Sequence, residues 1–429
     1  MLSWRHIVQL REHSLSRNVG WLILLQLANY IVPLIILPLL TRKLGLHSFG
    51  IVALTLAAIQ IAFVLTDYGF SLSATYGISK NRDRKDYIDN KISSVFAAKF
   101  VLVGTACALM IGIPLSIDEY RSYLNYFLVA LIAVVAQAFQ PTWLFQGIER
   151  MQKMVLSNVC TKFVYAALVL IAVDGPEDAI LVIYFWGGAQ VCGLIASLYL
   201  MHKSGYRLRV PSLPSIKKEL RDGANFFWSR IAVSIYTSAS ALIVGLSSTS
   251  QVAQYAVCEQ IYKAGQNLTS PINSALFPYM AKNKNWSTFY YLLLGLSSAI
   301  VLGCLFLYQF SAVILTIFFG PEYASASPLL GVFLCTVAVN YISVAFGYPA
   351  FSALGKIQYA NYSVIAGALL HFAMLSGLYF LSLINAYHVA ITVLITETFV
   401  LLFRLLAFFA IKKSVSLSGI SPALNSSIN

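Results

Sequence analysis

Charged residues are scarce in this sequence, and acidic residues are the scarcest. Asp, Glu, Lys and Arg make up only 10% of the 429 residues, and 16 residues are acidic. No glycine-rich phosphate-binding loop of the Walker type is present, which counts against an ATP-driven pump. The six cysteines lack the spacing of a metal site or a disulfide framework, so we interpret them as packing residues and predict no metal and no cofactor.

Long polar segments are missing as well. Hydrophobic residues make up 59% of the chain and the mean hydropathy is +0.76, which is typical of a polytopic membrane protein. Apolar runs of about 20 residues, enough helix to cross roughly 30 Å of hydrocarbon, recur along the chain. We predict an all-α integral membrane protein with about twelve transmembrane helices: 19–40, 49–70, 92–116, 122–146, 154–173, 179–201, 223–246, 252–280, 288–309, 326–350, 359–383 and 387–411.

Every connection between these spans is short, and the longest, residues 202–222, contains Pro211 and Pro214. It separates six spans from six, as expected for two parallel repeats that form two lobes around a cavity. Residues 1–17 lack the core of a cleavable signal peptide, and they could form an interfacial helix or a disordered tail. The predicted parts are an N-terminal segment 1–18, a lobe 19–201, a linker 202–222, a lobe 223–411 and a tail 412–429.

The excess of basic residues, 29 Lys and Arg in all, follows membrane topology. If the N-terminus is cytoplasmic, 21 of them fall in cytoplasmic segments and only Arg42, Lys43 and Arg121 fall in outer loops. This distribution satisfies the positive-inside rule with both termini cytoplasmic. A nucleic-acid partner therefore has no support, whereas membrane lipids are expected partners.

Five basic residues nevertheless lie inside predicted spans, and only three acids accompany them. An ionisable side chain at bilayer depth is costly unless it faces protein, water or a ligand, so each marks a candidate functional site. The imbalance suggests an anionic substrate. The five are Lys99, Lys162, Arg230, Lys263 and Arg404.

Three motifs resemble one transporter family. Pro141-Thr-Trp-Leu-Phe-Gln-Gly-Ile-Glu-Arg-Met151 is similar to a signature of Wzx-type flippases for O-antigen and capsule repeat units. Asp67-Tyr-Gly-Phe70, with Pro33, Pro38 and Gly45 before it, resembles the first helical pair of that family, although its usual form is Asp-Phe-Gly. Phe319-Gly-Pro-Glu-Tyr323 resembles the element that leads into the tenth span.

The resemblance implies the fold of the multidrug/oligosaccharidyl-lipid/polysaccharide (MOP) exporter superfamily, with two lobes that open alternately to each side of the bacterial inner membrane. It implies a flippase, not an enzyme, that moves an undecaprenyl-pyrophosphate-linked oligosaccharide to the outer leaflet. It also implies polysaccharide polymerase and chain-length machinery as partners.

The spans offer a polar path for such a substrate, since a glycan and a pyrophosphate must exchange their water shell for protein groups. We predict basic path residues on the seventh, eighth, fifth and twelfth spans and polar path residues on the eighth and fourth. For Lys99 we favour snorkelling to the headgroups, and for Trp143 a place at the membrane interface. The predicted path residues are Arg230, Lys263, Lys162 and Arg404 among the bases, and Gln266, Asn267, Gln137 and Gln140 among the polar residues.

The acids within the spans are candidates for ion coupling, because an intramembrane carboxyl can bind and release an ion as its access changes. They are Glu397, Glu259 and Asp67. Each has a structural alternative: Glu259 could pair with Lys263 one turn away, Glu397 could neutralise Arg404, and Asp67 could close a helix.

Two other functions stay open. A multidrug or small-solute antiporter of the same superfamily would move cations and should favour acids in its cavity. A membrane glycan polymerase or ligase would need a sizeable outer loop with catalytic residues, which this sequence lacks.

Overall fold

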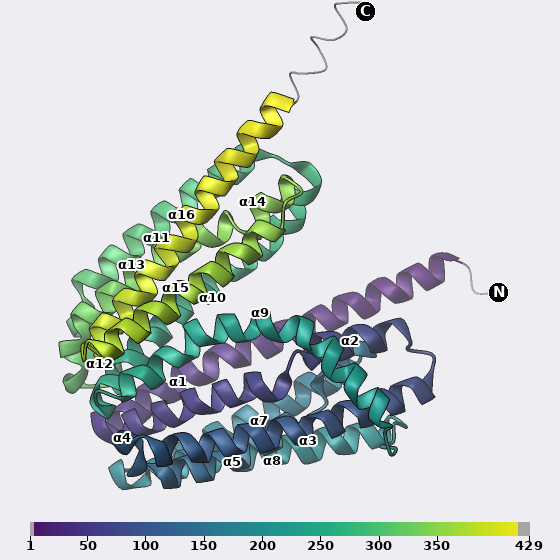
Figure 1. Ribbon diagram of the computed structural model, residues 1–429, viewed down its shortest axis with the longest axis horizontal. Helices are drawn as coiled ribbons and strands as arrows, with labels where there is room; N and C mark the ends of the chain where they lie inside the picture. Colours follow the sequence, from purple (N-terminus) through teal and green to yellow (C-terminus); the bar gives the residue numbers. More distant parts are fainter. Residues whose placement is uncertain (1–3, 419–429) are drawn as a thin grey trace, which may run out of the picture. The chain divides into compact units, whose positions relative to one another are not determined.

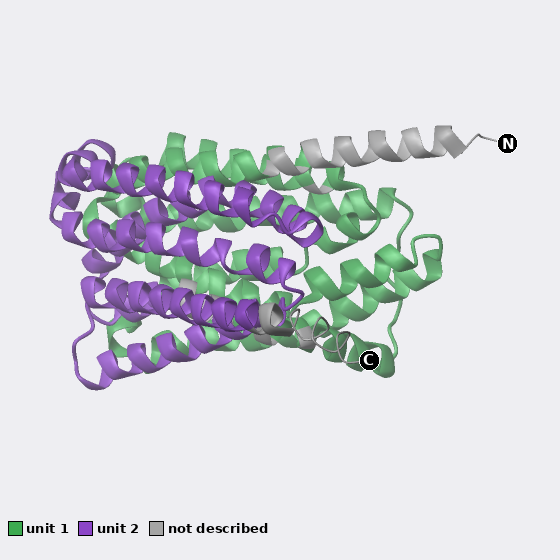
Figure 2. Ribbon diagram, turned by 90° about the horizontal axis from the view of Figure 1, so that it is seen from above, with its two compact units in different colours: residues 1–234 green, residues 235–429 purple. Residues whose placement is uncertain are grey.

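The computed structural model describes the backbone of residues 4–418 and the side chains of residues 21, 24, 26–153, 155–224, 226, 227, 231 and 239–413. All regular secondary structure in this described part is helical, which confirms the all-α prediction. The chain divides into two compact units, residues 1–234 and residues 235–429 (Figures 1 and 2). Each unit is described by itself below.

The first unit is built mainly from long helices joined by short turns (Figure 1). Its helices are α1 (Trp4–Asp67), α2 (Phe70–Lys80), α3 (Lys85–Ser116), α4 (Asp118–Arg121), α5 (Leu124–Ala138), α6 (Thr142–Gly147), α7 (Met151–Ala172), η1 (Pro176–Asp178) and α8 (Ala179–Lys203). Helix α9 (Leu213–Gly245) contains the boundary between the units. The division into lobes at 202–222 stays a prediction.

The second unit repeats this style of construction. Its helices are α10 (Thr249–Asn283), α11 (Trp286–Gln309), α12 (Ser311–Phe319), η2 (Pro321–Ala326), α13 (Ser327–Ala345), α14 (Tyr348–Ala353), α15 (Gln358–Phe380) and α16 (Ala386–Ser418). Side-chain caps fix two helix starts, since Ser248 accepts from the Gln251 amide at 3.2 Å and Asn285 accepts from the Thr288 amide at 3.1 Å.

Nine helices or helix pairs in the described residues are long and apolar enough to cross a membrane. The predicted first and second spans count as one of the nine, because α1 runs through both with a kink at Gly45 (φ 68°, ψ 177°). Glycine alone adopts this backbone conformation without steric cost. Helix α9 is described only in part, and α10 carries many polar residues; neither is among the nine. The number twelve and the cytoplasmic termini stay predictions.

Two predicted spans are divided rather than continuous. The span 122–146 is α5 followed by α6, and the break falls before Pro141, which lacks the amide hydrogen that a continuous helix would use. The span 326–350 is α13 followed by the start of α14, with Gly347 between them and Pro349 in the first turn of α14.

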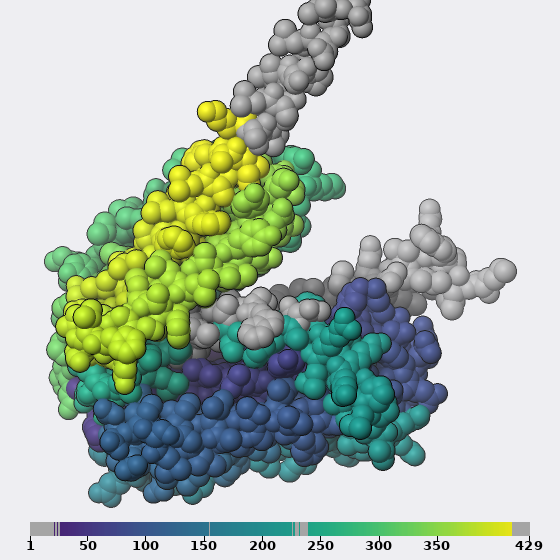
Figure 3. Space-filling model, viewed as in Figure 1, coloured from purple at the N-terminus to yellow at the C-terminus, as the bar shows by residue number. Residues whose placement is uncertain are grey.

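Apolar side chains point outward as well as inward. In the second unit, α15 and α16 form much of the face visible in Figure 3, and exposed side chains on them include Leu369, Phe372, Leu406 and Phe409. Such long apolar faces suit contact with lipid rather than water. Three cysteines, Cys160, Cys192 and Cys335, are also exposed, so the packing interpretation is wrong for these. The chain is a multi-pass membrane protein.

Polar contacts join loops that the topology assigns to the same side. In predicted outer loops, Lys43 Nζ donates to the Val173 carbonyl at 2.6 Å and pairs with Asp174 at 3.0 Å. In predicted cytoplasmic segments, Lys91 Nζ lies 2.6 Å from Glu219 Oε2, and both side chains are buried. Burial raises the pKa of the Glu219 carboxyl, and Lys91 opposes that rise.

The start of α9 lies directly against the turn between α1 and α2. A Cβ on Gly223 would lie 2.8 Å from the Tyr68 carbonyl oxygen, and a Cβ on Gly69 would lie 2.7 Å from the Gly223 carbonyl oxygen. The Tyr68 and Phe227 rings stack beside them with centroids 4.6 Å apart. Two glycines therefore let α9 approach the Asp-Tyr-Gly-Phe turn, which accounts for that motif by packing.

We expect Gly223→Ala to destabilise the protein, because the new methyl group cannot fit without moving backbone. The expected loss is about 1–3 kcal/mol, visible as a lower melting temperature of the purified protein in detergent. Gly104→Ala is the matched control, since a Cβ there meets nothing within 4 Å. Equal melting temperatures for the two variants would contradict this account of the packing.

Candidate functional site

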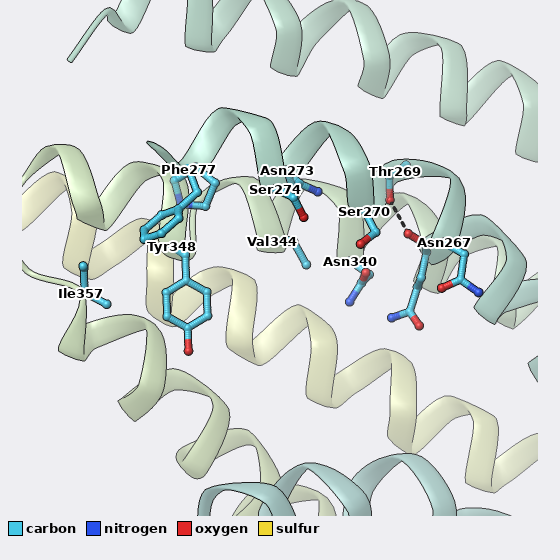
Figure 4. A pocket seen from close by; sticks show the side chains of 12 residues that line it. Asn267, Thr269, Ser270, Asn273, Ser274, Phe277, Asn340, Val344, Tyr348 and Ile357 are labelled. Carbon is cyan, nitrogen blue, oxygen red and sulfur yellow. Dashed lines mark hydrogen bonds between the residues drawn. The ribbon is translucent and has the colours of Figure 1, made fainter. Parts of the chain in front are cut away.

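A cavity of about 570 Å³ lies within the second unit. Helix α10 forms one wall, and α13, α14 and the turn before α15 complete it (Figure 4). Two predicted path residues, Gln266 and Asn267, line this cavity. The other lining residues are Thr269, Ser270, Asn273, Ser274, Phe277, Asn340, Val344, Tyr348, Pro349 and Ile357.

Polar side chains recur along the α10 wall at helical spacing. Asn267, Ser270 and Ser274 follow one another at spacings of three or four residues, so they lie on one face of the helix (Figure 4). Asn273 and Asn340 were not among the predicted path residues. The same spacing, extended beyond Ser270, would have found Asn273, whereas Asn340 lies on α13 and enters only through tertiary contact.

Lys263 lies one helical turn before the cavity-lining Gln266 and forms an ion pair with Glu259. The Lys263 Nζ and Glu259 Oε2 atoms are 2.8 Å apart, and the two side chains are 42% and 14% exposed. The structural alternative for this pair, an i, i+4 contact, is thus present. The Lys263 side chain still has accessible surface, so the pair does not exclude contact with a ligand.

A short chain of hydrogen bonds runs from the cavity wall to Glu397. Gln266 Nε2 donates to Tyr262 Oη at 2.7 Å, and Tyr262 Oη donates to Glu397 Oε1 at 3.3 Å. Tyr262 and Glu397 are both buried. The predicted coupling residue on α16 is therefore connected to a predicted path residue on α10 through one tyrosine.

Arg404 is held inside the second unit by hydroxyl and carbonyl groups. Its Nε donates to Ser363 Oγ at 2.8 Å, and its Nη1 donates to the Ser343 carbonyl at 2.7 Å and to Ser343 Oγ at 3.1 Å. A Cβ on Gly347 would lie 3.1 Å from Nη1, so the guanidinium fills the space above that glycine. These contacts join α13, α15 and α16.

The remaining predicted residues lie in the first unit or in α9. Gln140 Nε2 donates to Gln190 Oε1 at 3.0 Å, and Gln137 Oε1 is buried with no hydrogen-bond partner among the described residues. Lys162 is half-buried on α7. Asp67 accepts from Ser71 Oγ at 2.9 Å across the α1–α2 turn, which fits its alternative role in closing a helix. The Arg230 side chain lies outside the described residues.

The family whose description reads "Polysaccharide biosynthesis protein" matches residues 15–284 of this chain. The chain belongs to this family. A protein of Escherichia coli K12 named "Putative O-antigen transporter" is 31% identical over 267 residues, which are 62% of this chain and 64% of that protein. A protein of Shigella dysenteriae with the same name is 28% identical over 404 residues, 92% of this chain and 100% of that protein.

Solved structures establish the fold of this polysaccharide biosynthesis protein. An inward-facing multidrug resistance MATE transporter of the MOP superfamily superposes with a TM-score of 0.69 at 14% identity, covering 90% of this chain and 96% of that one. The lipid II flippase MurJ superposes with a TM-score of 0.67 at 12% identity, covering 94% and 93%. The resemblance read from the motifs is thus confirmed for family and for MOP fold.

In this family member, the motif between Pro141 and Met151 holds α6 against α2. Arg82 donates from Nε to the Gly147 carbonyl at 2.9 Å and pairs with Glu149 at 2.7 Å. A Cβ on Gly147 would lie 2.7 Å from Ile78 Cγ2, so only glycine fits there. Trp143 is 1% exposed within this core, and its predicted place at the membrane interface is wrong.

The snorkelling prediction for Lys99 is also wrong. Its side chain is 3% exposed, and Nζ donates to the Ala138 carbonyl at 2.5 Å. Ala138 is the last residue of α5, where a helix leaves carbonyl groups without intrahelical partners. Lys99 therefore satisfies the helix end that the Pro141 break creates.

We expect Arg404→Ala to destabilise this family member, because the substitution empties a packed site and leaves the Ser343 carbonyl without its donor. The expected loss is about 2–4 kcal/mol, measured as a lower melting temperature in detergent. Arg121→Ala is the matched control, since that side chain is 64% exposed. An unchanged melting temperature for Arg404→Ala would contradict this structural role and favour a role of Arg404 along the substrate path.

Proposed function

We propose that this protein is a flippase that moves an undecaprenyl-pyrophosphate-linked oligosaccharide, such as an O-antigen repeat unit, from the cytoplasmic to the outer leaflet of the bacterial inner membrane. The observation that carries the proposal is family membership across residues 15–284 together with the MOP fold. The relatives named as O-antigen transporters support the substrate class.

A polar cavity in a lipid-facing helical unit is what such transport needs. Sugar hydroxyls and phosphates lose their water shell on entering the membrane, so the protein has to replace those hydrogen bonds. The cavity beside α10 offers amides and hydroxyls for this purpose. The polyprenyl tail needs no such groups and can stay in lipid.

The cavity is less suited to a drug cation. None of its lining residues is a carboxylate, and the intramembrane charges are mostly basic. A cationic substrate would find no counter-charge in the wall, whereas a pyrophosphate would be attracted by Lys263 just beyond it. This favours the flippase over the multidrug antiporter. Polysaccharide polymerase and chain-length proteins would act on the delivered substrate, and the flippase would catalyse no covalent step.

Removal of the protein from its host tests the function directly. We expect the lipid-linked repeat unit to accumulate on the cytoplasmic leaflet, measured by its access to an externally added glycosidase in spheroplasts and in inverted vesicles. Re-expression of the wild-type chain should restore outward delivery. Normal outward delivery without the protein would refute the proposal.

Variants of Lys263 and of its ion-pair partner Glu259 distinguish a substrate-binding role of Lys263 from a structural one. If Lys263 attracts the pyrophosphate, Lys263→Ala should lower flux by about tenfold, equivalent to roughly 1.4 kcal/mol, while Glu259→Gln keeps the cation and should retain most of the flux. Lys356→Ala, at an exposed position, is the control. Equal losses in Lys263→Ala and Glu259→Gln would show that the ion pair has a structural role only.

We propose Glu397 as the residue that couples transport to an ion, and Tyr262 links its carboxyl to the cavity-lining Gln266. We expect Glu397→Gln to abolish the dependence of flux on an imposed proton or sodium gradient, because the amide cannot exchange charge. Tyr262→Phe removes the hydroxyl between Gln266 and Glu397 and should weaken the same dependence. Flux in proteoliposomes would be measured with each gradient in turn.

The control for this series is Tyr341→Phe, which removes the hydroxyl of another buried tyrosine. That hydroxyl donates to the Leu292 carbonyl at 3.4 Å rather than to Glu397. Retained gradient dependence in Glu397→Gln would exclude that carboxyl as the coupling group.

A further inference from the structure

Two buried asparagines, Asn273 and Asn340, line the α10 cavity. Asn273 is 8% exposed and Asn340 is 7% exposed. The Oδ1 atom of Asn273 is buried and has no hydrogen-bond partner among the described residues, and Asn340 lines the same cavity from α13. A buried carboxamide without a partner costs free energy, so its presence calls for a ligand that supplies one.

The chemistry of a carboxamide selects among ligands. Its oxygen only accepts hydrogen bonds and its nitrogen only donates them. A phosphate or carboxylate at neutral pH mainly accepts, so it would leave the Asn273 oxygen unsatisfied. A sugar hydroxyl both donates and accepts, and an acetamido group carries one N–H and one C=O, so either can satisfy both ends of the amide.

The rest of the wall agrees with an uncharged ligand. None of the lining residues is charged, and Ser270 and Ser274 add hydroxyl groups on the α10 side (Figure 4). Phe277 and Tyr348 lie at one end of the cavity, with ring centroids 6.1 Å apart and planes at 75° (Figure 4). Aromatic faces carry negative charge density and pack well on the C–H face of a sugar ring.

The cavity also has suitable dimensions. Its volume of about 570 Å³ lies within the range of roughly 300–1,000 Å³ that small-molecule sites occupy. Lys263 precedes Gln266 by three residues, about 4.5 Å along the helix, so the basic group is next to the neutral wall rather than within it. A ligand with a neutral part and an anionic part could contact both along α10.

We propose that this cavity is a binding subsite for an uncharged sugar ring of the transported glycan, with Asn273 and Asn340 as its hydrogen-bonding residues and Phe277 and Tyr348 as its aromatic end. The inference rests on the proposed function for the identity of the whole substrate. It adds that the second unit recognises the sugar itself, so that binding depends on the sugar as well as on the pyrophosphate.

The test compares two soluble probes on the purified full-length protein in detergent: farnesyl diphosphate, and farnesyl diphosphate linked to N-acetylglucosamine. We expect the wild-type protein to bind the sugar-bearing probe at least about tenfold more tightly by isothermal titration calorimetry. The double variant Asn273→Ala with Asn340→Ala should bring that ratio close to one while leaving the affinity for farnesyl diphosphate unchanged. Asn125→Ala, exposed on α5, is the matched control.

The melting temperature separates binding from a structural role. Asparagines that hold the fold together would lower the melting temperature when removed, whereas removing an unsatisfied buried amide should leave it unchanged or raise it. If the double variant fails to fold, Tyr348→Ala decides the matter, and an unchanged sugar-dependent ratio in that variant would contradict the proposal. Tyr348→Ala, at a half-exposed position, then provides an independent reading of the sugar-dependent ratio and is expected to lower it.

The outcomes distinguish this inference from the proposed function. Equal affinity of the wild-type protein for both probes, or a ratio that survives the double variant, would overturn the sugar subsite. Translocation of the lipid-linked repeat unit would stand in that case. Conversely, sugar-dependent binding in a protein that moves no lipid-linked glycan would refute the flippase proposal and leave the subsite in place.

Discussion

The constraint on which this structure depends is that hydrocarbon offers no hydrogen bonds. Every polar group brought into a transmembrane helix has to find a partner in the protein or in something that the protein binds. Arg404 satisfies this through Ser343 and Ser363, and Lys99 through the free carbonyl at the end of α5. Among the described residues, Asn273 is one of several with a buried polar atom that has no partner, and it lies in the wall of the α10 cavity.

The same constraint separates the basic residues by role. A buried cation that donates hydrogen bonds to internal acceptors is held within the fold and is less available to a substrate. Lys99 and Arg404 are of this kind in the described structure, with exposures of 3% and 6%. Lys263 combines an internal partner with a 42% exposed side chain, which leaves it the better placed of these three to contact an anion.

Two of the motifs that resemble the family, Pro141–Met151 and Asp67–Phe70, pack helices together. Gly147 and Glu149 hold α6 against α2, and Gly69 lets α9 approach the turn between α1 and α2. Motifs of this kind are tied to the MOP fold, which explains why they reveal the family without revealing the sugar. The cavity beside α10 contains none of them. The proposed sugar subsite and these packing motifs therefore use different residues.

The sequence by itself determined the features that depend on contiguous residues, which are the lengths of the apolar helices and the local motifs. Apolar runs predicted the membrane helices, Gly45 and Pro141 lie where the helices kink or break, and short motifs predicted the family. The sequence also predicted Gln266 and Asn267 as polar path residues, and both line the α10 cavity. Only the tertiary structure decided which polar groups are satisfied. Asn273 and Asn340 lie on different helices, and Lys99 reaches the end of another helix, so their roles depend on contacts between residues far apart in the chain.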